Sequence, residues 1–259
     1  LLDEVRAAHP GLEIESCSSG GGRVDLGVLE RTDRVWTSDN IDPHDRQTTL
    51  RWTTQLIPPE YMGSHIASGR SHTTGRRHDL GFRAATAIFG HLGVEWDLTR
   101  ATDPELAELR AWIRFYKHER DLLLRGDLVR MDSLDPTQFA YGVVARDRSR
   151  AIFAAGSTDS LYPDPPPRLK LRGLDPDRHY RLRPLLVGSV PSGLQPPLWW
   201  GRPAAQSDEP PYLPKVALDT QFPGAVFTGT ALEHVGVASP RVHPDQVVLY
   251  RADATDEDG

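Results

Sequence analysis

The chain has 259 residues, of which 38% are hydrophobic and 25% are charged, and its formal net charge at pH 7 is −6. These values are typical of a soluble globular protein with one large domain or two smaller ones. The acidic balance and the scattered cationic residues argue against a nucleic-acid surface, and no run of about 18 apolar residues predicts a membrane span. A single cysteine excludes an internal disulfide framework and suits a reducing compartment, so we expect a cytoplasmic protein.

The first residues have the spacing of a helix but no signal for its beginning. Leu1, Leu2, Val5 and Ala8 share one helical face, which residues 9–11 (His-Pro-Gly) bring to an end. They lack the basic start and the apolar segment of a signal peptide. A helix with neither an initiator Met nor a cap leads us to expect that the chain was cut from a longer protein.

From residue 1 to about residue 130, strand and helix signals alternate, as they do in parallel βα units. We expect Asp42 to cap one helix, with Pro43 in its first turn and Asp45 completing a capping-box-like arrangement, and Asp103 to cap the last helix. Four strand-plus-helix units amount to half of an eight-unit barrel. The predicted strands are 12–17, 34–38, 61–63 and 92–98, and the predicted helices begin near residues 42, 78 and 103, after a short helical or irregular link at 24–30.

After residue 131 the pattern changes to short strands separated by turn clusters, which is typical of an antiparallel sandwich. The predicted fold class is therefore α/β: half of a (β/α)8 barrel over 1–130, followed by an antiparallel β-sandwich over 131–259. We expect long surface loops where proline and glycine gather at 188–224, and a disordered acidic tail from residue 252. The strand candidates are 139–145, 151–155, 168–172, 180–186 and 247–251.

Two motifs follow the first two strand candidates. One is CSSGGGR at 17–23, and the other is WTSDNID at 36–42. Because strand ends hold loop residues around one mouth of an α/β barrel, we expect the two motifs to lie together. The glycines let backbone approach a ligand closely. A phosphate loop is disfavoured, because Gly-x-x-x-x-Gly-Lys-Ser/Thr is missing.

This pair of motifs, in this order and at this spacing, resembles the α-galactosidases of glycoside hydrolase family 36. The resemblance continues through PPEYMGSHI at 58–66, HTTGR at 72–76 and GDLVR at 126–130. It implies a retaining hydrolase that releases terminal α-linked galactose from oligosaccharides such as melibiose or raffinose-type sugars. Two carboxyl groups carry out that reaction, so the resemblance implies no metal and no organic cofactor. Related enzymes with the same motifs transfer galactose to another sugar or act on N-acetylgalactosamine.

The resemblance also assigns residues. It makes Asp39, the first Asp of the Ser-Asp-Asn motif, the general acid/base. The family's nucleophile lies in a Lys-Trp-Asp-type motif upstream of the glycine loop; the sequence has none, so we expect this Asp upstream of Leu1 and the isolated chain to be inactive. The implied substrate contacts are Cys17, Ser19, Gly20 and Trp36, with supporting positions at Gly22, Arg23, Asp42 and His65.

Structural explanations compete with several of these assignments. Ser-Asp-Asn is a common turn composition, Asp42 suits helix capping better than sugar contact, and Cys17 could be a small buried residue. His65 suits a core or surface position, and its spacing from His72 and from residue 78 does not predict a metal site. Residues 199–200 (Trp-Trp) could stack on a sugar but suit packing better.

The second functional interpretation is a non-catalytic carbohydrate-binding or assembly module, supported by the missing nucleophile. The intact Ser-Asp-Asn motif argues against this interpretation. Neither interpretation involves a nucleic acid or a membrane, and homo-oligomerisation is left open.

Overall fold

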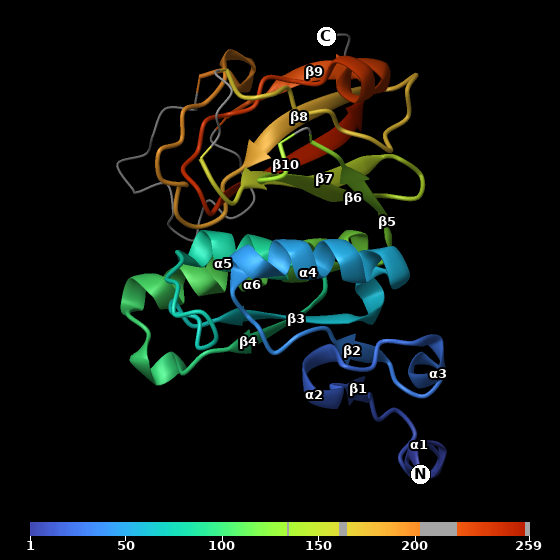
Figure 1. Cartoon of the computed structure of the whole chain (residues 1–259). Coiled ribbons are helices and arrows are strands. Elements are labelled where there is room, and N and C mark those ends of the chain that lie inside the picture. Colours follow the sequence, from blue (N-terminus) through green and yellow to red (C-terminus); the bar gives the residue numbers. More distant parts are fainter. Residues whose placement is uncertain (134, 161–164, 203–221, 257–259) are drawn as a thin grey trace.

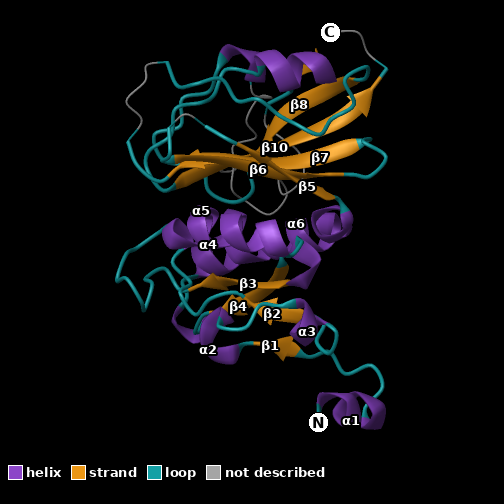
Figure 2. Ribbon diagram, turned by 45° about the vertical axis from the view of Figure 1, so that its right-hand side comes forward, coloured by secondary structure: helices purple, strands orange, loops and turns teal. Residues whose placement is uncertain are grey.

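The computed structural model describes residues 1–133, 135–160, 165–202 and 222–256. A four-stranded parallel sheet and a six-stranded antiparallel sheet lie on opposite sides of a layer of helices (Figure 1). A view turned by 45° shows the same three layers, with α4, α5 and α6 in the middle (Figure 2). The N-terminus lies beyond the parallel sheet, on the side away from the helices.

The parallel sheet confirms the four predicted βα units. Its strands follow chain order, and every neighbouring pair is parallel. Since its outer strands have one partner each among the described residues, the sheet has two edges of the kind that a closed barrel would remove. The strands are β1 (Glu15–Ser16), β2 (Arg34–Trp36), β3 (Met62–Ala67) and β4 (His91–Glu95).

Six α-helices accompany these strands in the described residues. They are α1 (Leu2–Ala8), α2 (Ser18–Gly21), α3 (Leu26–Leu29), α4 (Pro43–Leu56), α5 (Leu80–Ala87) and α6 (Asp103–Arg125). Shorter helical turns are η1 (Pro59–Tyr61), η2 (Leu98–Arg100), η3 (Leu198–Trp200) and η5 (Ala231–Val235).

Two of the predicted caps need correction. Asp42 caps α4 as expected, but Asp45 does not complete a capping box, because its carboxylate accepts hydrogen bonds from Asn40 and Arg76 instead. The cap of α6 is Thr102, not Asp103. The Thr102 hydroxyl accepts from the third residue of the helix, whose side chain accepts from the Thr102 backbone, which is a complete capping box.

The antiparallel sheet has the strand order β5-β6-β7-β10-β8-β9. Of the predicted strands, 168–172 is wrong, because that segment makes only the single bridge Leu169↔Val237. The strands are β5 (Asp127–Met131), β6 (Gln138–Val144), β7 (Arg150–Ser157), β8 (His179–Leu185), β9 (Ala225–Thr228) and β10 (Gln246–Thr255).

The expected disorder from residue 252 is also wrong, since β10 continues to Thr255. Ala252 is fully buried, and the carboxylate of Asp253 is paired with Arg183 and Arg251. Alternating small apolar residues and paired charges therefore extend the strand into the acidic segment. The last three residues, 257–259, and residues 203–221 of the proline-rich segment lie outside the described residues.

One large apolar core joins the helical layer to both sheets. Ile66 of β3, Phe82 of α5, Phe115 of α6 and Ile152 of β7 all contribute to it, and none is more than 1% exposed. A second core covers the other face of the antiparallel sheet. It contains the fully buried Trp200, which therefore has the packing role expected for residues 199–200. The helices thereby hold the two sheets in a fixed relation.

Among the described helices, none combines the length and the apolar character needed to cross a membrane.

Candidate active site

The loop that follows β2 carries Asp39 at the carboxyl end of the parallel sheet. The indole N–H of Trp36, the last residue of β2, donates a hydrogen bond of 2.8 Å to Oδ1 of Asp39. Trp36 is 7% exposed, whereas Asp39 is an exposed residue. One carboxylate oxygen is thus held from the protein side while the residue stays accessible.

The glycine-rich loop after β1 lies directly against Asp39. Gly20 has a φ of 70°, and a Cβ added there would lie 2.7 Å from the carboxyl carbon and from Oδ2 of Asp39. A Cβ at Gly21 would overlap the backbone oxygen of Thr37. The two motifs therefore meet as the strand-end argument predicts, and only residues without a side chain permit this approach.

The backbone of this loop is strained. Ser18, Ser19, Gly20 and Gly21 all have positive φ angles, of 50°, 57°, 70° and 87°. A non-glycine residue in this region costs about 1 kcal/mol or more, and such residues gather at binding and catalytic sites. The turn closes on Cys17, whose Sγ accepts from the N–H of Gly20 at 3.4 Å.

Cys17 is exposed, so the interpretation of it as a small buried residue is wrong. Ser19 is exposed as well, and both residues therefore lie where a ligand can reach them. Gly22 keeps the turn closed, because its N–H donates to the backbone oxygen of Ser18 at 3.0 Å. Arg23 points to a different partner: its Nε donates to Asp25 at 3.1 Å. Since Asp25 caps α3, Arg23 supports the start of that helix.

A residue that sequence reasoning missed holds the Asp39 loop in place. Arg46, in the first turn of α4, is 2% exposed and donates to three acceptors of the loop. They are the backbone oxygens of Asn40 at 3.0 Å and Ser38 at 2.7 Å, and the hydroxyl of Thr37 at 3.2 Å. Burial lowers the pKa of Arg46 to about 10, so the guanidinium remains charged at neutral pH. No local pattern in the sequence distinguishes this arginine, because its acceptors come from the loop that folds back on α4.

Two further side chains come from the ends of β3 and β4. The ring of His65 stacks on Trp36, with centroids 4.2 Å apart, and its Nδ1 lies 3.0 Å from Oε2 of Glu95. Gly93 gives this ring space, because a Cβ there would lie 2.5 Å from Cδ2 of His65. His65 therefore contacts Trp36, the residue whose indole N–H donates to Asp39. The sequence places Glu95 only in the strand candidate 92–98.

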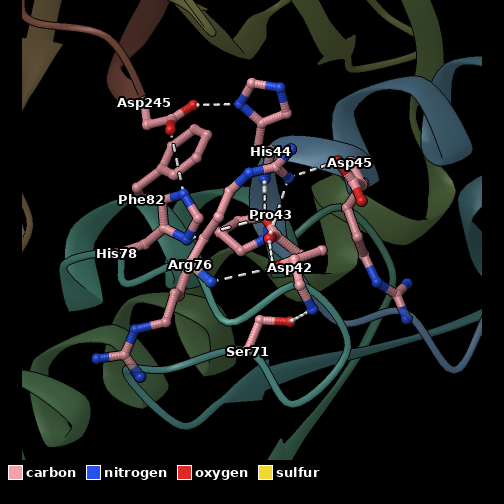
Figure 3. Close-up of polar contacts among 12 residues, drawn as sticks. Asp42, Pro43, His44, Asp45, Ser71, Arg76, His78, Phe82 and Asp245 are labelled. Carbon is pink, nitrogen blue, oxygen red and sulfur yellow. Dashed lines mark hydrogen bonds and ion pairs between the residues drawn. The ribbon is translucent and has the colours of Figure 1, made fainter.

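Asp42 is fully buried at the start of α4, which leaves it capping the helix and not contacting a sugar. Its Oδ1 accepts from the N–H of His44 at 2.9 Å, and its Oδ2 accepts from Thr74 and from Arg76 (Figure 3). Arg76 also donates to Asp45 at 2.7 Å, a bond that raises the pKa of Arg76. The HTTGR motif thus supplies partners for the α4 N-terminus.

The arrangement suits proton transfer by a carboxyl group. Asp39 is accessible, and its position is fixed by Trp36 and Gly20. Over the ranges that the structure describes, no three His, Cys, Asp or Glu side chains group as metal ligands.

Comparison with known proteins gives a consistent result over both parts of the chain. Residues 1–126 match the family model Melibiase, and residues 138–253 match the glycosyl hydrolase family 36 C-terminal domain. The chain is 39% identical over 216 residues to an alpha-galactosidase of Escherichia coli. The aligned region covers 81% of this chain and 30% of that protein. It is 34% identical over 188 residues to alpha-galactosidase AgaA of Geobacillus stearothermophilus, covering 72% and 26%.

Solved structures agree. A GH36 alpha-galactosidase AgaA variant from Geobacillus stearothermophilus in complex with raffinose matches with a TM-score of 0.79 and 28% identity, over 98% of this chain and 30% of that chain. The alpha-galactosidase from Lactobacillus brevis matches with a TM-score of 0.79 and 27% identity, over 100% and 31%. The chain spans about 30% of the length of the relatives it matches.

Proposed function

The chain belongs to glycosyl hydrolase family 36, and from this membership we propose that the intact protein containing it is a retaining α-galactosidase in which Asp39 is the general acid/base. The observation that carries the proposal is the position of Asp39. It lies at the carboxyl end of a parallel strand, held by a buried indole and pressed against a strained glycine loop. This is where α/β barrels place their catalytic groups.

The proposed reaction has two steps. In the first, Asp39 gives its proton to the glycosidic oxygen as the bond breaks, and a second carboxylate attacks the anomeric carbon from the opposite face. In the second, Asp39 removes a proton from water, whose oxygen attacks the anomeric carbon and displaces the second carboxylate, so galactose is released with net retention. Trp36 fixes the direction of the carboxyl group, and Arg46 keeps its loop in one conformation.

We place the nucleophile in the remaining part of the intact protein. The chain spans about 30% of its relatives, and its four parallel strands are half of the eight that a barrel needs. A strand paired with the free edge of β1 would complete the mouth. In a retaining enzyme its carboxylate would stand about 5 to 5.5 Å from that of Asp39.

For the substrate we propose terminal α-galactosides, including raffinose-type oligosaccharides. Support comes from relatives of this chain, since AgaA structures contain raffinose and stachyose. The turn of Cys17, Ser19 and Gly20, in which Cys17 and Ser19 are exposed, is the proposed contact for the galactose ring, through the Cys17 side chain and the main chain of the turn. The buried Trp36 would act on the sugar only through Asp39.

The test is hydrolysis by the intact purified protein of an aryl α-galactoside, melibiose and raffinose, followed by proton NMR. Release of galactose with the α-anomer appearing first supports the proposal, because a double displacement retains configuration. Transfer of galactose to an added sugar acceptor in preference to water would identify a galactosyl transferase. Preference for N-acetylgalactosaminides, or sugar binding without turnover, would contradict the proposal.

A further inference from the structure

A carboxylate of the C-terminal domain reaches across to the start of α4. Oδ1 of Asp245 lies 2.7 Å from Nδ1 of His44, and Oδ2 lies 3.1 Å from Nε2 of His78 (Figure 3). The backbone of Asp245 is itself fixed, with a φ of 56° and an N–H that donates to the oxygen of Ser157 at 2.9 Å. A rigid strand end of one domain therefore presents both carboxylate oxygens to the other.

Both histidines also contact Asp42, the cap of α4. The His78 side chain is 4% exposed, and its Nδ1 lies 3.8 Å from Oδ1 of the fully buried Asp42. That same oxygen accepts from the backbone N–H of His44. Asp245, His44, His78 and Asp42 thus form a ring of contacts around the first turn of α4, as Figure 3 shows. A shift of Asp245 would move this turn.

The same turn holds the loop of the acid/base. Arg46 follows His44 by two residues and donates to the backbone of Ser38 and Asn40, the two neighbours of Asp39. Its burial leaves the guanidinium no alternative partner in water. The contacts therefore run without a gap from the C-terminal domain, through α4, to the peptide groups on either side of Asp39.

We propose that Asp245 is a positioning residue of the C-terminal domain, which sets the orientation of Asp39 by holding the first turn of α4. The inference rests on the proposed function, because it assigns Asp245 to the proton-donating step. Asp245 touches neither Asp39 nor the glycine loop through any described contact. Its burial works to raise its pKa, but the hydrogen bonds from His78 and His44 outweigh this and lower it, so the side chain is an anionic acceptor.

The neighbouring residue supplies a matched control. Gln246 joins the same two domains, because its amide donates to Oδ2 of Asp79 at 2.6 Å. Asp79 caps α5, not α4. Removing Gln246 therefore weakens the contact between the domains without loosening the turn that carries Arg46.

The experiment measures kcat/KM of the intact protein for 4-nitrophenyl α-galactoside and for melibiose. Nitrophenolate leaves without a proton, whereas the glucose of melibiose needs one. Displacing the acid therefore lowers kcat/KM mainly for melibiose. Asp245→Ala is expected to lower kcat/KM for melibiose at least tenfold more than for the aryl substrate. Asp245→Asn should fall between, because its amide oxygen still accepts one bond, and Gln246→Ala should leave the ratio of the two values unchanged.

Amide hydrogen exchange over residues 37–44 provides a second readout that does not need turnover. Exchange there should be faster in both Asp245 variants and unchanged in Gln246→Ala. Equal losses on both substrates, or unchanged exchange in this segment, would overturn the inference. Asp39→Ala is measured in parallel: if it shows the substrate split and the Asp245 variants do not, only the inference fails. A wild-type protein that hydrolyses neither substrate would overturn both proposals.

Discussion

Trp36, the last residue of β2, donates a hydrogen bond of 2.8 Å to Asp39 in the loop that follows, from a buried indole to an accessible carboxylate. The distance is that of a strong bond to an acceptor that can be charged. This bond fixes Oδ1 from the protein side and leaves the rest of the carboxyl group accessible to a ligand. In the intact protein, substitutions at and around this pair should therefore change proton transfer or stability.

Replacing Asp39 by Asn removes the proton donor with almost no change in shape. For melibiose we expect kcat/KM to fall by about 10² to 10⁴, the usual contribution of a positioned general acid. The loss on an aryl galactoside should be smaller, because its leaving group needs no proton. Asp177→Asn, an exposed change in the C-terminal domain, is the control and should have no effect. A loss below about tenfold on melibiose would exclude Asp39 as the acid/base.

Trp36→Phe keeps the ring that stacks on His65 but removes the N–H that holds Asp39. Loss of one such bond is worth about 1.5 kcal/mol, which corresponds to roughly a tenfold decrease in kcat for melibiose. Trp52→Phe serves as the control, since Trp52 is 64% exposed on α4. Steady-state kinetics on both variants would test this, and full activity of Trp36→Phe would show that the indole N–H is dispensable.

Gly20→Ala places a methyl group against the Asp39 carboxylate. Gly11→Ala is a close match, because Gly11 also has a positive φ, of 90°, but nothing lies within 4 Å of the added Cβ. Both variants should lose about 1 to 2 kcal/mol of stability from backbone strain. Only Gly20→Ala should also lose activity, by at least a hundredfold. Equal activity of the two variants, at equal melting temperature, would contradict the close packing of the two motifs.

Arg46→Lys retains the charge but cannot reach three acceptors at once. Leaving buried acceptors without donors costs about 1 to 3 kcal/mol each, so the free energy of unfolding should fall by at least about 2 kcal/mol. Urea unfolding measures this, with Arg110→Lys on the exposed face of α6 as the control. If the two variants unfold at the same urea concentration, Arg46 does not hold the loop.

Local chemistry made much of this fold and site predictable from the sequence. The start of α4 follows from Asp42 and Pro43 alone, and the meeting of Gly20 with Asp39 follows from the rule that parallel strand ends share one edge. Both features depend on residues close together or on a general property of α/β folds. The resemblance of the motifs then added the chemistry.

Features set by tertiary contacts could not be predicted in this way. Nothing local distinguishes Arg46 from other arginines, because its three acceptors become neighbours only when the Asp39 loop folds back on α4. The contact between Asp245 and His44 joins positions 201 residues apart. The order of the acidic tail could not be predicted either, because Asp253 is neutralised by arginines of β8 and β10 that meet it only in the folded sheet.

Asp45 makes the stability of the α4 N-terminus depend on pH. Burial works to raise its pKa, but hydrogen bonds from Arg76 and Asn40 lower it below the ordinary value. In the unfolded chain the pKa of an Asp is about 3.9. Since the folded pKa is the lower one, the unfolded state takes up protons first as the pH falls. The stabilisation is therefore complete well above pH 4, and is lost as the pH falls through the folded pKa.

Urea unfolding of the wild type and Asp45→Asn from pH 7 to pH 3 would measure this dependence. We expect the difference in free energy of unfolding to stay constant between about pH 7 and pH 5 and to shrink below about pH 4. Arg76 keeps its charge throughout this range, so it adds no titration of its own. A difference that grows as the pH falls would mean that Asp45 is more stable protonated, and that its contacts with Arg76 and Asn40 do not form in solution.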